Sequence, residues 1–94
     1  MKTVEVEVYS DASNHWIVRT PGRRFPALIV QGDTFHSLLA DVEALAANLS
    51  TILGPNAEPA EEAAAIADSL RERLADYERT ITAAGFELPY APRR

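Results

Sequence analysis

Apolar residues recur in the first third of the chain with the pattern of β-strands. Residues 3–9 alternate polar side chains with three valines, Val4, Val6 and Val8. A period of two predicts a strand with one face turned to a core. Residues 15–19 and 26–31 are rich in aromatic and β-branched types and predict two more strands, the last bearing Pro26 as an edge strand would. Turn formers such as Pro21-Gly22 separate them, so we expect a three-stranded antiparallel sheet.

The apolar spacing then changes to that of helices. Residues 34–53 and 59–84 each carry apolar side chains at intervals of three and four residues, which predicts two amphipathic helices. Gly54-Pro55 ends the first helix, and Pro59 suits the first turn of the second. Beyond about residue 86 the chain is too proline-rich for regular structure. The pattern predicts an α+β fold in a single domain, 1–94, with an irregular C-terminal tail.

Charge and composition narrow the classes of partner. The net charge of −5 repels phosphate and disfavours nucleic-acid binding, whereas a basic protein is an easier electrostatic match. The chain has no cysteine, as a reducing compartment permits. No stretch approaches the apolar length of a membrane span or of a secretory leader. We therefore expect a cytoplasmic protein with no membrane or nucleic-acid partner.

The second predicted helix is long for so small a chain. Its 26 residues make a rod of about 39 Å, against a diameter of about 31 Å for a compact chain of this length. A projecting apolar stripe needs another surface, and a second copy is the commonest one in soluble oligomers. We therefore expect a homodimer through Ile66, Leu70, Leu74, Tyr77 and Ile81. The alternatives are a kinked helix or a tail, Leu88–Pro92, that folds back over the stripe.

No catalytic or metal-binding pattern stands out. His15 and His36 are the two histidines, and neither has a second ligand at helical or hairpin spacing. The carboxylates Asp11, Asp33 and Asp41 lie on a predicted turn, cap and helix, where nothing forces them together. We therefore expect no enzymatic activity, no cofactor and no metal.

The residues best suited to contact a partner lie around the second predicted turn. Arg19, Arg23 and Arg24 are the basic concentration of the folded part, and they could bind an acidic group or pair across the sheet with Glu5 and Glu7. Trp16 and Phe25 flank them. Trp16 could anchor a partner or belong to the core, and Phe25 could anchor a partner.

The segment Phe25-Pro26-Ala27-Leu28-Ile29-Val30-Gln31-Gly32-Asp33-Thr34-Phe35 resembles the strand-to-helix segment of HicB-like antitoxins. The resemblance covers about residues 2–50. It implies a helix packed across a small sheet, and a domain that binds and blocks a small basic ribonuclease toxin. After Leu53 the chain departs from that family, because it shows no fourth strand and no DNA-binding tail.

A second resemblance spans nearly the whole chain. The motifs Pro-Gly-Arg-Arg-Phe-Pro at 21–26, Val-Gln-Gly-Asp at 30–33 and Leu-Pro-Tyr at 88–90 resemble a family of small uncharacterised bacterial proteins. This likeness implies kinship and supplies no activity.

Two functions fit these features. One is a protein-binding module of antitoxin or immunity type that neutralises a small basic partner, with Trp16, Arg19, Arg23, Arg24 and Phe25 at the contact. The other is a self-associating accessory or small-ligand protein with a pocket between sheet and helix near Arg23 and Arg24.

Overall fold

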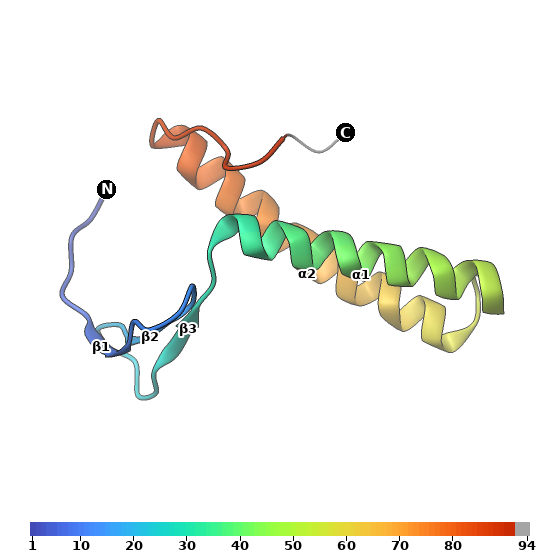
Figure 1. Ribbon diagram of the computed structural model, residues 1–94, viewed down its shortest axis with the longest axis horizontal. Coiled ribbons are helices and arrows are strands. Elements are labelled where there is room, and N and C mark those ends of the chain that lie inside the picture. The colour runs from blue at the N-terminus through green and yellow to red at the C-terminus, as the bar shows by residue number, and fades with distance from the viewer. Residues whose placement is uncertain (92–94) are drawn as a thin grey trace. The chain divides into compact units, whose positions relative to one another are not determined.

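The computed structural model describes residues 1–91, which form two compact units. Residues 1–31 form a small sheet, and the chain from Gly32 onward forms a helical hairpin with a C-terminal tail (Figure 1). The order of elements is three strands and then two helices, which confirms the α+β fold.

The sheet is antiparallel in the order β1-β2-β3, with β1 Glu7–Ser10, β2 Trp16–Arg19 and β3 Ala27–Ile29. Val8 pairs with Val18, and a bulge between Val8 and Ser10 shifts the register of the β1–β2 ladder. The β2–β3 turn is closed by a hydrogen bond of 3.2 Å from the Arg23 N–H to the Thr20 carbonyl. Gly22 supplies the positive φ of 79° that this turn requires.

The strands are shorter and more exposed than the alternating pattern predicts. Val4 and Val6 precede β1, and they and Val8 remain exposed. Among the described residues of this unit only Val18, on the central strand, is buried. The prediction of a half-buried first strand was therefore wrong. Alternation predicts which side chains share a face of a strand, but it does not predict whether other residues bury that face.

The helices begin and end close to the predicted positions: α1 is Gly32–Leu53 and α2 is Glu58–Ala83. The Thr34 N–H donates to Asp33 Oδ1 at 2.8 Å, so a predicted cap residue satisfies a helix-start donor from within the first turn. Proline stands in the first turn of α2, where its missing N–H costs nothing, with Glu58 and Glu61 beside the positive helix end.

The core of the helical unit lies between α1 and α2. Leu39, Ala67 and Leu74 are buried together, and Phe35, Val42, Leu70 and Tyr90 pack against them. Ala60 and Ala63 are also buried on α2. Small side chains let two helices approach closely, so the alanine-rich start of α2 accounts for tight pairing near the hairpin turn. The hairpin, unlike the sheet, therefore has a core of its own.

The C-terminal segment folds back onto the hairpin. Gly85, with φ 95°, ends α2 and lets the Phe86 N–H donate to the Ile81 carbonyl at 2.9 Å. Tyr90 then stacks on His36 with ring centroids 3.9 Å apart, and its hydroxyl donates to Glu78 at 2.9 Å. The tail thus returns to the helices at Tyr90, which packs against the cluster that contains Leu74 of the predicted stripe. Ile66 of that stripe remains exposed, and residues 92–94 lie outside the described part of the chain.

The start of α1 has no room for a side chain. A Cβ built on Gly32 would fall on the ring of Tyr77. We expect Gly32→Ala to lower the free energy of unfolding by about 1–2 kcal/mol, because the ring must leave its place in the hairpin. In a Tyr77→Ala background the same change should be neutral or stabilising, since alanine favours helix over glycine. Urea titration of the four variants measures the difference; equal effects in both backgrounds would contradict the steric explanation.

Candidate functional site

All five residues predicted to contact a partner lie in the sheet unit. Trp16 begins β2 and Phe25 precedes β3, and they are 42% and 72% exposed. Exposed aromatics of this size are costly to leave in water and are common anchors in protein interfaces. The core alternative for Trp16 does not hold in this structure.

Arg19 and Glu7 form a cross-strand ion pair. The two residues are register partners in the β1–β2 ladder, and the Arg19 Nε–H donates to Glu7 Oε1 at 2.5 Å. The hydrogen bond to Glu7, and then the negative charge of that carboxylate, raise the pKa of Arg19 above its ordinary value. The expected pairing of Arg19 across the sheet is therefore present. It accounts for one of the three arginines near the second turn.

The other two arginines differ from Arg19. The guanidinium of Arg24 lies 5.3 Å from the centre of the Phe25 ring, in a cation–π contact. Neither Arg23 nor Arg24 forms an ion pair with another residue of the described chain. These two charges and the Phe25 ring thus form an exposed cationic and aromatic corner beside β3.

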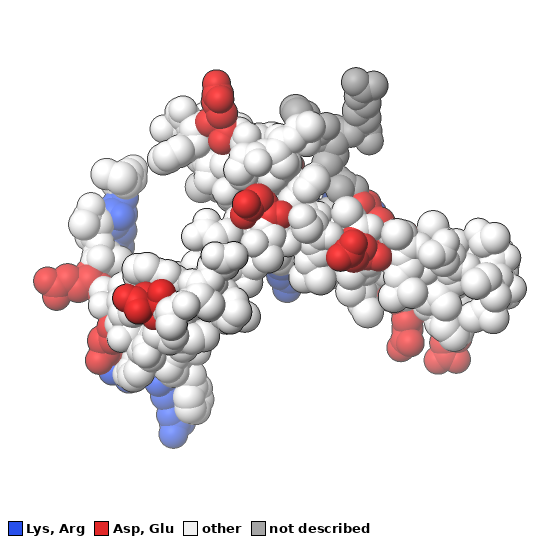
Figure 2. Space-filling view, in the orientation of Figure 1, with Lys and Arg blue, Asp and Glu red and all other residues white. Residues whose placement is uncertain are grey.

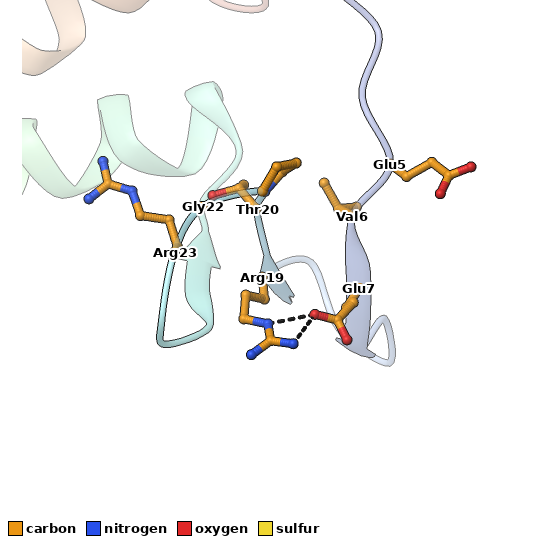
Figure 3. Close-up of a pocket in the computed structure, with 8 residues that line it drawn as sticks. Glu5, Val6, Glu7, Arg19, Thr20, Gly22 and Arg23 are labelled. Atoms are coloured by element: carbon orange, nitrogen blue, oxygen red, sulfur yellow. Dashed lines mark hydrogen bonds and ion pairs between the residues drawn. The ribbon is translucent and has the colours of Figure 1, made fainter.

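A hollow of about 480 Å³ opens on the sheet unit. It is lined by Glu5, Val6, Glu7, Arg19, Thr20, Pro21, Gly22 and Arg23, all from residues 1–31. Arg24 does not line it. Figure 3 shows the Arg19–Glu7 pair at one side, with Glu5 and Arg23 extending away from each other. Because Arg19 and Glu7 already neutralise each other at the hollow, it is a poor binding site for a charged small molecule.

The predicted dimer residues on α2 fall into two groups. Leu74 is buried in the hairpin core, with Leu70 packed against it, and Tyr77 and Ile81 are half-buried. Ile66 alone of the five is exposed. The sequence reasoning missed an exposed apolar row on α1, formed by Leu38, Leu45 and Ile52. Its signal was present in the sequence as a strict interval of seven residues.

The two histidines make contacts that are common for structural residues. His36 stacks on Tyr90, and the carbonyl of His15 accepts a hydrogen bond from the Ser13 hydroxyl at 2.9 Å. Within residues 1–91, no three histidine or carboxylate side chains come close enough together to hold a metal ion. Neither of the two helices has the length and apolar character needed to cross a bilayer.

Charge divides unequally between the two units. Eleven of the fourteen acidic residues and five of the nine basic ones lie from Gly32 onward in the sequence. The charged side chains that are visible on the hairpin in Figure 2 are accordingly mainly acidic. The sheet unit instead holds Lys2 and the three arginines against Glu5, Glu7 and Asp11. The acidic field of the protein therefore comes from the helical unit, and the cationic and aromatic corner from the sheet.

The sequence was compared with models of known protein families. A family model described as a family of unknown function, DUF6959, matches residues 1–90. The chain belongs to the DUF6959 family. The match covers the sheet, the hairpin and the tail as far as Tyr90, so all of these elements lie within the family's domain. No curated protein and no solved structure matches this DUF6959 chain.

Proposed function

We propose that this DUF6959 chain is a non-enzymatic binding module that captures and neutralises a small basic protein, in the manner of an antitoxin or immunity protein. The observation that carries the proposal is the exposed Trp16 and Phe25 on a sheet unit with one buried residue, Val18, among those described. Large apolar side chains gathered on a thin sheet mark interaction surfaces more often than ordinary monomer surface.

The edges of the sheet offer a second means of binding. β1 and β3 are the outer strands, so each has one side that pairs with no strand of the described sheet. Unpaired backbone groups on an edge can accept an additional strand from a partner, which gives affinity through main-chain hydrogen bonds. Leu28 and Ile29 of β3 are exposed and would contact alternate side chains of such a strand.

The charge distribution supports a basic partner. The helical unit supplies the acidic field that would speed encounter with a basic protein, while Trp16 and Phe25 would supply most of the binding energy. Arg23 and Arg24 would then pair with acidic residues of the partner and fix the orientation of the contact. The likeness of residues 25–35 to HicB-like antitoxins agrees with this division, since those domains block a basic toxin.

Affinity capture with three baits tests the proposal: wild type, Trp16→Ala/Phe25→Ala, and Glu58→Lys/Glu61→Lys/Glu62→Lys. From a native-host lysate, we expect wild type to retain one stoichiometric basic protein. Calorimetry with that protein should show at least about thirtyfold weaker binding for the aromatic variant, the loss of one anchor of about 2 kcal/mol. The charge-reversed variant should associate about tenfold more slowly at low salt and lose most of this difference at high salt.

The control is Thr82→Ala/Glu87→Ala, two exposed positions outside the sheet and C-terminal to Glu58, Glu61 and Glu62. It should bind as wild type does. Capture of an acidic protein, or binding that survives the loss of both aromatics, would overturn the proposal.

A further inference from the structure

The helical hairpin has one closed face and one open face. The closed face carries the Arg71–Glu43 ion pair, whose Nη2–Oε2 distance is 2.7 Å and which links the two helices. The stacked rings of His36 and Tyr90, and the Tyr90–Glu78 hydrogen bond, lie on the same side by helical position. The tail therefore covers the face marked by Glu43 and Arg71.

The opposite face is apolar along α1. Each residue turns about 100° around an α-helix, so Leu38, Leu45 and Ile52 lie about 140–180° around α1 from Glu43. They are 47%, 54% and 77% exposed, although all three are aliphatic. Val42 and Leu49 lie between this row and the core and are half-buried. Leu38, Leu45 and Ile52 are called the α1 seam below.

On α2 the same face is mostly polar. Ile66 lies about 140° from Arg71 and is exposed, and it is accompanied by Glu62 and Arg73 on this side. A partner helix placed over α2 would bury these charges, which is unfavourable without matched partners. A helix placed over α1 would meet only the aliphatic seam and its polar margins.

We propose that the α1 seam binds the α1 seam of a second copy, so that two hairpins associate through one antiparallel pair of α1 helices. The spacing 38–45–52 is symmetric about Leu45, so a two-fold axis at Leu45 brings each Leu38 against the other copy's Ile52. The interval of seven residues is that of helices packed by knobs into holes.

The area of the α1 seam suits a weak dimer. α1 is 22 residues long, or about 33 Å, and a helix with its side chains is about 10–12 Å wide. The contact is therefore on the order of 350 Å² per copy, below the total of about 1,200 Å² that a stable interface buries. We therefore expect a dissociation constant in the high micromolar range, with monomer and dimer both observable.

Sedimentation velocity over a wide concentration range tests the association. Wild type should pass from monomer to dimer mass as concentration rises. Leu45→Asp places a charge on the two-fold axis and should weaken the dimer at least about a hundredfold, while its circular dichroism stays helical. The matched control is Ala47→Asp, an exposed position about 200° around the same helix, which should dimerise as wild type does.

Disulfide cross-linking tests the antiparallel geometry, since the chain has no cysteine of its own. Helix axes 8–10 Å apart bring facing Cα atoms to about 4–5 Å, within the range of a disulfide. The oxidised Leu45→Cys variant should therefore run as a covalent dimer, and the Ala47→Cys variant as a monomer.

A chain that stays monomeric at all concentrations would overturn the proposal and leave the seam to another segment of the same chain. A dimer unaffected by Leu45→Asp would place the interface elsewhere, and a dimer of the Leu45→Cys variant that does not cross-link would exclude the antiparallel pairing. Capture of a basic partner through Trp16 is measured separately, so either proposal can fail without the other.

Discussion

Replacing Leu39 by alanine should lower the free energy of unfolding of the helical unit by about 3 kcal/mol. Leu39 is 0% exposed and lies at the centre of the cluster with Ala67 and Leu74. Deleting its three outer carbons removes their burial and leaves a cavity that rigid helices fill only in part. Because small domains have a total stability of about 5–15 kcal/mol, this one change should unfold a measurable fraction of the hairpin.

Urea unfolding followed by helical circular dichroism measures this loss, at one fixed protein concentration because association adds stability. The matched control is Leu53→Ala, the same substitution at an exposed position of the same helix and outside the α1 seam. It should cost less than about 1 kcal/mol. Similar losses at both positions would contradict the assignment of Leu39 to the core.

The helices were predictable because periodicity and termini agree. An apolar interval of three and four residues, a stop at Gly54-Pro55 and a proline in the first turn of α2 place both helices within about two residues of their observed bounds. The order and antiparallel pairing of the strands were predictable from the turn residues for the same reason: local geometry decides them.

Burial was less predictable, because it depends on tertiary packing. The stripe of α1 contains both Leu39, which is buried, and Leu45, which is exposed, and their hydrophobicity is the same. Which of them faces α2 follows from the crossing of the helices, a property of both helices together. The valines before and within β1 were likewise expected in a core that the sheet unit does not build.

The candidate site shows the same division. The Arg19–Glu7 pair could be expected from strand alternation and opposite charge, and it is present. The exposure of Trp16 could not be expected, because an aromatic residue in a short strand fits a core and a binding surface equally well. The structure therefore strengthens the case for Trp16 as a partner contact.

The two proposed surfaces lie on different units and would bind through different kinds of interaction. The sheet unit offers aromatic anchors, two arginines outside its ion pair and strand edges, which suit a partner of another kind. The α1 seam offers aliphatic side chains with a spacing symmetric about Leu45, which suits a copy of itself. A dimer formed through α1 would present two sheet units, and a partner with two sites would then bind more tightly than either contact alone allows.

The tail should contribute strongly to stability for its length. Tyr90 packs against the core cluster, stacks on His36 and donates a hydrogen bond to Glu78. Tyr90→Ala removes all three, and we expect a loss of about 2–3 kcal/mol in the free energy of unfolding of the hairpin. Urea titration by circular dichroism measures it.

Tyr90→Phe separates these contributions, because it keeps the ring and removes only the hydroxyl. It should cost about 1 kcal/mol, the net value of one hydrogen bond that is partly open to solvent. Combining Tyr90→Ala with His36→Ala should show a coupling of about 0.5–1.5 kcal/mol from the stacked rings. If Tyr90→Ala were as stable as wild type, the tail would not be packed, and the closed face of the hairpin would be open like the face that carries the α1 seam.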